Sequence, residues 1–455
     1  GGVKVSSLAV QVDDLTLLIP ITKLGDASQW GLDLAGMAVA LEAGPVKLSG
    51  GLLKNFGPPV SYDGALMVDV CGRGFTAIGS YARPTDELGE YVSFFVFVSL
   101  PIPLGGPPYF FVLGLGGGVG LNRALIPPED LNLLPSFPLV AAIDNSAFAN
   151  DPMSALRDMG TSIPPRRGSF WLAAGLKFST FALVNSTAVL YVALDRGVEI
   201  GLLGLSRMSL PSADFAIAQI ELALKARFST EEGLLSVQAQ LTDRSYLFHP
   251  ACQLTGGFAF FLWFRTGRFV LTLGGYHKAF NKPADFPVVP RLGFRWSVSD
   301  AIVIKGENYF ALTTTAVMAG GRLEASFHGG PVKAWFKTWL DVLVAWDPFY
   351  YMFDAGIEIG ASVDTGIFGE VGISLGASVH IEGPPLQGYV EVEILIVTVH
   401  IDFGDKAHKI NYIEDFNVFK GKYLTSDDTR SAVDVQLRAG LLPTDPPGAE
   451  PAPRS

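Results

Sequence analysis

Residues 353–383 read FDAGIEIGASVDTGIFGEVGISLGASVHIEG, and apolar residues occupy every second position over almost the whole stretch. Ile357 and Ile359 fall on one side of this alternation, while Gly356 and Glu358 fall on the other. A period of two is typical of a β-strand, because successive side chains of a strand point to opposite faces of its sheet. The segment TGIFGE interrupts the pattern, so this stretch predicts two strands joined by a turn.

The same alternation recurs along nearly the whole chain, in segments such as GLDLAGMAVALEA, GRFVLTLGGYH and GYVEVEILIVTVHIDFG. At about 8 to 12 residues for each strand and turn, the chain has room for roughly 20 or more strands. Short turns between them favour antiparallel pairing. The sequence therefore predicts an all-β fold. We expect a single large, mainly antiparallel curved sheet, barrel-like or wrapped into two layers, with one short helical insertion.

Domain organisation follows from where the alternation stops. Residues 1–424 are predicted to form one large β domain, and residues 127–167 within it an irregular or helical insertion that serves as a plug, lid or crossover. Residues 150–160 carry an N-cap signal, a proline at the first helical position and a terminal glycine, which predicts a short helix. Residues 425–455 are a C-terminal extension, Pro-rich and disordered from about residue 443.

The composition is unusually apolar for so large a β protein. Apolar residues make up 49% of the chain and charged residues 17%, and the mean hydropathy is +0.34. Much of the surface must therefore be hidden in a thick core, a lipid bilayer, a bound ligand or a partner. A membrane-spanning helix does not fit the uncharged residues 91–121, because Pro101, Pro103, Pro107 and Pro108 interrupt them and each costs about 3 kcal/mol inside a helix. These residues predict two strands joined by a Pro-rich turn.

Some segments are apolar on both faces of the predicted strand. In YVSFFVFVSL, Val96 lies opposite Phe95 and Phe97, and in EILIVTVHI both sets of alternating positions are again apolar. A strand that is apolar on both sides needs a dry layer against each side. We therefore expect a sheet whose second face is filled, covered or closed around an apolar cavity. Phe95, Phe97, Leu395 and Val397 should then all be removed from solvent.

Several chemistries are not indicated. The net charge of −11 disfavours nucleic acid as a partner, since binding phosphates needs surfaces dense in Lys and Arg. Cys71 and Cys252 are too few and too distant to suggest a disulfide scaffold or a metal site. GLGGGVG fits neither the dinucleotide nor the phosphate-loop spacing, so it predicts a strand face without side chains that another layer approaches closely.

No catalytic residues, metal ligands or cofactors are predicted. His380 and His400 could face each other across the GPPLQG hairpin, but a packed or solvated pair is the favoured interpretation over a metal site. Carboxylates such as Glu391 and Glu393 share a strand face, as they would on any solvated sheet.

One stretch carries a candidate ligand-binding patch. In VKAWFKTWLDVLVAW, Lys333, Trp335, Lys337 and Trp339 share one strand face. Indole rings interleaved with ammonium groups suit the face of a sugar or the anionic headgroup of an amphiphile. The alternative is structural: the tryptophans pack under a neighbouring layer and the lysines extend to water.

The order of several phrases over about residues 8–424 carries a family resemblance. Among them are PLGGPPYFFVLGLGGGVGLNRAL, FWLAAGLKF, LTGGFAFFLWF and VPRLGFRWSVSDAIVIKGENYFALTTTAVMAGGRLEASF. Together they resemble a large glycine-rich domain of unknown function found in long bacterial and fungal proteins. The resemblance implies one continuous β-rich domain in a protein that often carries further segments, and it implies no catalytic residues.

Three hypotheses for function stay open. The first is a non-enzymatic β scaffold whose apolar interior binds or shelters a hydrophobic ligand such as lipid, as the low charge and the aromatic residues suggest. The second is a structural or assembly module, whose apolar faces meet partner chains or further domains of a longer protein without any ligand. The third is a membrane β-barrel, in which strands of about ten residues alternate lipid-facing apolar with inward-facing polar side chains.

Overall fold

The computed structural model describes residues 2–5, 8–18, 31–43, 46–55, 60–70, 73–144, 159–212, 215–367, 369–395 and 397–404. Residues 1–403 form one compact unit. Of the helix predicted for 150–160, residues 159–160 are described, and they belong to a helical segment that ends at residue 162. The predicted extension 425–455 lies outside the described residues.

Strands dominate the described part of the chain. The earlier strands are β1 (Gly2–Val5), β2 (Leu8–Leu18), β3 (Gly31–Ala43), β4 (Val46–Asn55), β5 (Ser61–Val70), β6 (Arg73–Ala82), β7 (Thr85–Asp86), β8 (Gly89–Glu90), β9 (Ser93–Leu100), β10 (Phe111–Arg123), β11 (Pro165–Thr180), β12 (Val184–Leu194), β13 (Val198–Pro211) and β14 (Ala216–Ser229). The later strands are β15 (Leu234–Leu241), β16 (Tyr246–Leu247), β17 (His249–Thr255), β18 (Gly257–Trp263), β19 (Arg268–Leu273), β20 (Leu292–Ser297), β21 (Ile302–Thr313), β22 (Ala316–Gly329), β23 (Val332–Trp346), β24 (Phe349–Asp364), β25 (Glu370–Gly383), β26 (Gln387–Leu395) and β27 (Val397–Gly404). Between β10 and β11 lie the 3-10 helix η3 (Leu131–Ser136) and the helix α1 (Pro138–Asp144).

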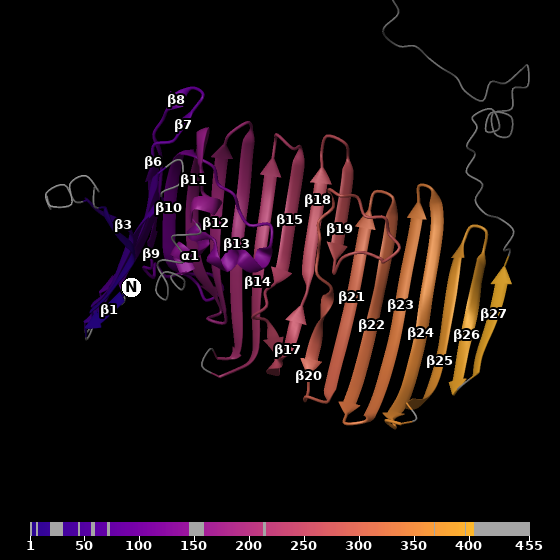
Figure 1. Ribbon diagram of the computed structural model, residues 1–455. Coiled ribbons are helices and arrows are strands. Elements are labelled where there is room, and N and C mark those ends of the chain that lie inside the picture. The colour runs from indigo at the N-terminus through magenta and orange to yellow at the C-terminus, as the bar shows by residue number, and fades with distance from the viewer. Residues whose placement is uncertain are drawn as a thin grey trace, which may run out of the picture. The chain divides into compact units, whose positions relative to one another are not determined.

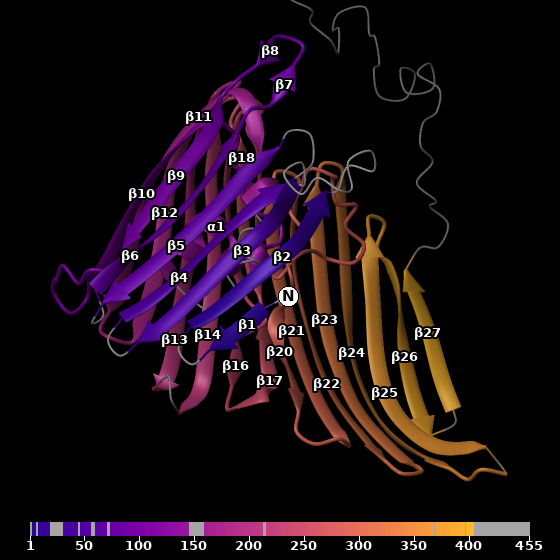
Figure 2. The ribbon, with the colours of Figure 1, turned by 60° about the vertical axis from the view of Figure 1, so that its left-hand side comes forward.

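All described strands except β7 and β8, which pair only with each other, form one large antiparallel sheet that follows the chain (Figure 1). Most strands pair with the next strand in sequence, and Figure 2 shows β2 to β6 side by side in that order. Such a meander needs only short turns, which antiparallel neighbours permit. β9 and β10 are the two strands expected on either side of the Pro-rich turn. The prediction of an all-β, mainly antiparallel fold with a short helical insertion is confirmed, and one sheet is the form that it takes.

Between β14 and β21, three strand positions of the sheet are each divided into two short strands: β15 and β16, β18 and β17, and β19 and β20. β14 pairs with β15 and, farther along, with β16, while β21 pairs with both β19 and β20. Between them β15 pairs with β18, β18 with β19, β16 with β17 and β17 with β20. These pairings close a ring of strands within the sheet, and residues 274–291 leave the sheet at this ring.

The insertion between β10 and β11 covers one face of the sheet. α1 packs against β6 and against β9 to β13, as its place in Figure 1 indicates. All residues of α1 except Asp144 are buried, and they share a core with Phe95, Phe97, Trp171 and Tyr191. The sequence did not predict α1, because a helix that is apolar on all sides shows no amphipathic period.

Glycines let α1 approach the sheet closely. A Cβ on Gly116 would lie 3.3 Å from Cγ1 of Ile143 and 3.0 Å from the ring of Phe97, and a Cβ on Gly175 would overlap Ile143. A Cβ on Gly120 would overlap the indole of Trp171, which lies across this glycine from the neighbouring strand β11 and packs in the core with α1. The prediction that GLGGGVG forms a strand face for the close approach of another layer is therefore confirmed.

A second cover lies farther along the same face. Residues 274–291 place Tyr276 and Phe280 against the buried side chains of β21 and β22. Directly opposed residues of neighbouring strands point to the same side of a sheet. A row of such residues crosses the sheet from Phe97 on β9 to Thr313 on β21, so these two residues lie on the same side. Both covers therefore lie on one side of the sheet, which we call the covered face.

Candidate functional site

The other side of the sheet carries apolar side chains from strand to strand. We call it the apolar face and define it as the alternate residues of β9 to β26 that share a side with Val96. Two of the rows of directly opposed residues that cross it are Val96–Val119–Leu172–Val192–Ile200 and Ala325–Phe336–Ile359–Leu375–Ile394.

Charge is absent from the apolar face. At the positions that the register pairs between β9 and β26, this face carries no Asp, Glu, Lys or Arg. Among its few polar groups, the hydroxyls of Ser186 and Ser206 are 2.8 Å apart and bond to each other. Thr338 donates to the carbonyl oxygen of Gly356 at 3.1 Å. Because these hydroxyls already have hydrogen-bond partners, removing them from water costs less free energy than removing unbonded hydroxyls.

The apolar face is open to solvent across the sheet. Leu172 and Leu190 on the earlier strands are 53% and 50% exposed, and Ile359, Ile373 and Leu375 on the later strands are 52%, 59% and 55% exposed. Single exposed apolar side chains are ordinary on soluble proteins, whereas continuous patches beyond a few hundred Å² mark interaction sites. An apolar face of this extent is therefore the candidate functional site.

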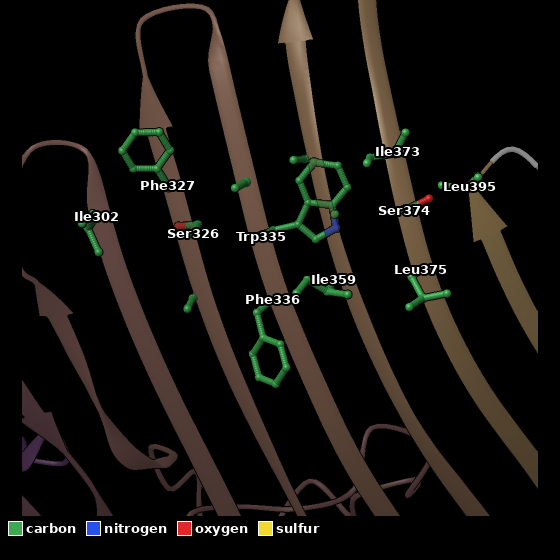
Figure 3. A pocket seen from close by; sticks show the side chains of 14 residues that line it. Ile302, Ser326, Phe327, Trp335, Phe336, Ile359, Ile373, Ser374, Leu375 and Leu395 are labelled. Carbon is green, nitrogen blue, oxygen red and sulfur yellow. The ribbon is translucent and has the colours of Figure 1, made fainter.

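A shallow hollow marks the later part of the apolar face. It has a volume of about 560 Å³ and lies across β21 to β26. Figure 3 shows Phe336, Ile359 and Leu375, which contribute to it from three adjacent strands. Phe327 and Ile302 extend it toward β21. Ligand sites for apolar molecules are concave and lined in this way, with few polar groups.

The expectation that both faces of the doubly apolar strands are dry is wrong: on β9 only the face of Phe95 and Phe97 is buried, and Val96 on the other face is 41% exposed. Phe95 and Phe97 are 2% and 0% exposed, because α1 covers them. Leu395 and Val397 are 55% and 57% exposed, so the prediction of burial is wrong for these two residues. The physical reason is the position of the covers, which pack on β6 to β13 and around the β21–β24 region, while no described segment reaches the end of the sheet.

Charged groups gather on the covered face. Beneath the insertion, the fully buried Glu221 accepts hydrogen bonds from Arg207 and from the hydroxyl of Thr242, and Arg207 also binds Asp144 at the end of α1. Burial lowers the pKa of the enclosed Arg123 guanidinium to about 10. The covered face thus holds both an apolar core and the charged side chains of these strands, while the apolar face carries no charge at its paired positions.

On the later strands the covered face is a network of paired polar groups. Lys333 lies 3.1 Å from Glu370, and Tyr309 donates to Asp341 at 2.7 Å. Burial, together with this hydrogen bond, raises the pKa of Tyr309 well above its usual range, so the phenol stays protonated. Such pairing holds the polar side chains against the sheet and away from the apolar face.

The two histidines considered as metal ligands pack instead on one tyrosine. The ring of Tyr389 lies 5.2 Å from the ring of His380 and 4.9 Å from that of His400, so it separates them. Asp354 pairs with His380 at 2.7 Å, and Glu391 lies 3.3 Å from His400. Within the described residues, no cluster of three His, Cys, Asp or Glu side chains suits a metal ion.

The four candidate residues of the ligand-binding patch lie together on β23, on the covered face. The indole nitrogen of Trp335 donates to Glu358, whose carboxylate also lies 3.4 Å from Lys337. Lys337 and Trp339 line a polar hollow of about 450 Å³. Trp335 is instead among the residues that line the hollow across β21 to β26, as Figure 3 shows. Binding of a sugar or an anionic headgroup by these residues stays a prediction.

Each tryptophan of this patch lies across a glycine of the neighbouring strand. A Cβ on Gly360 would overlap the indole of Trp335, and a Cβ on Gly356 would overlap that of Trp339. We expect Gly360→Ala to lower the free energy of unfolding by about 1–3 kcal/mol, since overpacking at a tight contact costs that much. Urea unfolding measures this loss.

Gly117→Ala is the matched control for this substitution. Its Cβ would lie 3.7 Å from the nearest atom, the carbonyl oxygen of Ala173, which is ordinary contact. We expect Gly117→Ala to leave stability unchanged or slightly raised. Equal losses for the two variants would show that Trp335 does not depend on the space above Gly360.

Comparison with known families matches residues 1–445 to the model of a family of unknown function, DUF6603. The chain belongs to this family. The resemblance to a domain of unknown function is thereby confirmed, and the match includes the whole compact unit of this DUF6603 protein. A comparison with curated proteins found no match. None of the helices that the structure describes in this DUF6603 chain is long and apolar enough to cross a membrane.

Sequence reasoning missed the apolar face of the DUF6603 sheet as a site. Residues such as Phe336, Ile359 and Leu375 were expected to face inward, because one apolar side of a sheet normally packs on a core. The available signal was the absence of charge from one set of alternating positions in strand after strand. Only the register shows that all these sets belong to a single face.

Proposed function

We propose that this protein is a non-enzymatic β scaffold that binds lipid by holding hydrocarbon chains against its apolar face. The observation that carries the proposal is the charge-free side of the sheet from β9 to β26, with residues such as Ile359 and Leu190 about half exposed. Each methylene removed from water contributes about 0.8 kcal/mol. An acyl chain laid along these strands therefore gains several kcal/mol without any polar contact.

The length of the apolar rows supports lipid as the ligand. On β13 apolar positions run from Val198 to Leu210, a distance of about 40 Å at roughly 3.3 Å per residue. The hydrocarbon layer of a bilayer is about 30 Å thick, and strands tilted by about 45° cross it. The face is thus long enough to contact whole acyl chains, either of bound lipid molecules or of a membrane.

Hydrogen bonds and ion pairs on the covered face support the same proposal. A structural module that associated by its apolar face would gain specificity from polar groups placed among the apolar ones. Here the polar side chains on the apolar face are few, and Ser186, Ser206 and Thr338 bond within the sheet. At the described, paired positions of this face no charged side chain is present to select a particular protein surface, whereas fluid hydrocarbon needs no such selection.

The test is lipid content and uptake by the full chain. Protein purified without detergent should release phospholipid or fatty acid on solvent extraction, detected by mass spectrometry. After the lipid is removed, the protein should take up a fluorescent fatty acid from solution. If the protein were recovered only in detergent extracts of membranes, its apolar face would contact the hydrocarbon of a bilayer and not single bound lipid molecules. Soluble protein with neither bound lipid nor uptake would contradict the proposal and favour the assembly module.

A further inference from the structure

In an antiparallel meander every second turn lies at the same edge of the sheet. One edge therefore collects the connections β9–β10, β11–β12, β13–β14, β16–β17, β20–β21, β22–β23 and β24–β25. The amide of Phe181 bonds to the carbonyl oxygen of Pro108 across two of them at 2.6 Å. Five of these connections, all except β20–β21 and β22–β23, carry a large apolar side chain that is at least 62% exposed. They are Tyr109, Phe181, Phe215, Phe248 and Ile367, with exposed fractions between 62% and 93%. We call this edge the apolar edge.

The five exposed residues are the turn tips of the apolar edge, and at two of them the backbone conformation is unusual for a phenylalanine. Phe181 and Phe248 have φ angles of +53° and +65°, a region where Gly, Asn and Asp are the favoured residues. A phenylalanine there is strained, and about two thirds of each side chain is exposed in the isolated protein. Retaining an aromatic ring at such a position is explained when the ring has a partner outside the chain.

The apolar edge is continuous with the apolar face. Phe248 packs on Trp296 at 6.3 Å between ring centroids, and Phe110 packs on Phe178 at 4.9 Å. Trp296 and Phe178 both belong to the apolar face through the register of β20 and β11. A hydrocarbon chain can thus pass from the edge to the face without meeting a charged side chain.

The opposite edge is different in charge. Its turns carry Asp195, Arg196, Glu231 and Glu232, and several of its residues are ion-paired, as Arg166 is with Asp195 at 2.9 Å. On the apolar edge the connection 298–301 carries Asp300, but the described residues 101–110, 181–183, 298–301, 330–331 and 365–367 contain no Lys or Arg. The apolar edge therefore fits a surface whose attraction does not depend on anionic groups.

We propose that the apolar edge inserts its turn tips into the interface of a phospholipid bilayer, so that lipid passes between the bilayer and the apolar face. The partner is a zwitterionic bilayer, because the tips offer aromatic rings and no basic cluster. Aromatic side chains favour the headgroup level of membranes, and apolar protrusions reach about 5–10 Å into it. This inference rests on the proposed binding of lipid by the apolar face.

The test is sedimentation of the full chain with phosphatidylcholine vesicles. The variant F181N/F215S/F248N removes three tips, and Asn suits the positive φ angles at 181 and 248. We expect vesicle binding to fall at least tenfold, while uptake of a soluble fluorescent fatty acid by the apolar face is unchanged. Absence of fatty-acid uptake by the unmodified protein would contradict the proposed function and the passage of lipid to the apolar face, whereas vesicle binding tests the insertion of the turn tips separately.

A matched control removes equally exposed apolar residues from the other edge. L88S/F349S/L386S replaces side chains that are 80%, 59% and 54% exposed, and vesicle binding should stay within twofold of the unmodified protein. Equal loss in both variants, or no loss in the first, would overturn the proposal.

A label at one tip gives a second readout that needs no triple variant. With Phe215→Cys carrying an environment-sensitive fluorophore, we expect a blue shift of emission on adding the vesicles. The same fluorophore on Leu88→Cys should show none. An unshifted spectrum at position 215 would overturn the proposal.

Discussion

Ile359→Lys should weaken lipid binding by about 30-fold or more, since a lysine in contact with hydrocarbon costs roughly 2–4 kcal/mol. Ile359 lies in the hollow of the apolar face and is 52% exposed, so the change should leave folding intact. Its opposed neighbours, Phe336 and Leu375, are apolar, so the ammonium group gains no partner. Titration with a fluorescent fatty acid measures the loss, and circular dichroism checks the fold.

The control places the same charge on the other side of the same sheet. Ser378 lies on the covered face, opposite Glu391, so Ser378→Lys gains an acidic neighbour. We expect its lipid affinity to stay within twofold of the unmodified protein. If Ile359→Lys bound lipid normally, or if Ser378→Lys lost as much, the apolar face would not be the binding surface.

Phe97→Ala should lower the free energy of unfolding by about 3–5 kcal/mol, as expected when a fully buried aromatic ring is removed. Phe97 is 0% exposed and packs in the core that α1 forms with the sheet. The substitution leaves a cavity between two rigid layers that cannot collapse easily. Urea unfolding followed by tryptophan fluorescence suits the measurement, because Trp171 lies in the same core.

Phe94→Ala is the control on the same strand. Phe94 lies on the apolar face, opposite Leu121 and Tyr81, whereas the described helix α1 packs on the other face of β9 with Phe95 and Phe97. We expect less than half of the loss seen for Phe97→Ala, together with weaker lipid uptake. Equal destabilisation would mean that both faces of β9 are packed alike, against the assignment of one covered and one open side.

Periodicity was enough to predict strands and the turns between them, although not α1. The alternation in residues 353–383 became β24 and β25, with the turn at the expected place. The Pro-rich residues 101–110 became a connection between β9 and β10. These predictions succeed because strand formation and turns depend on local patterns, which the sequence displays directly.

Which side of the sheet is covered depends on distant parts of the chain. Alternation shows that Ile359 and Glu358 face opposite ways, but not which of them meets water. That depends on where α1 and residues 274–291 dock, and α1 is too uniformly apolar to be recognised from its sequence. The result is that the carboxylate of Glu221 is buried while the side chain of Ile359 is half exposed.

For the candidate patch on β23, too, the sequence shows which residues share a face but not which residues of the neighbouring strand they contact. The sequence places Trp335 and Lys337 on one face, and the structure agrees. It could not show that Trp335 donates to Glu358 or that the indole lies across Gly360, because both contacts belong to the partner strand. Register is the missing information, as it is for the apolar face.

Site-directed nitroxide labelling along β24 tests the central claim most directly. In a background without Cys71 and Cys252, labels at 357, 359 and 363 report on the apolar face, and labels at 358, 362 and 364 on the covered face. With phospholipid present, the first three should become accessible to oxygen and shielded from a water-soluble nickel reagent, while the others do not change. If accessibility showed no period of two along the strand, hydrocarbon would not be what meets this side of the sheet.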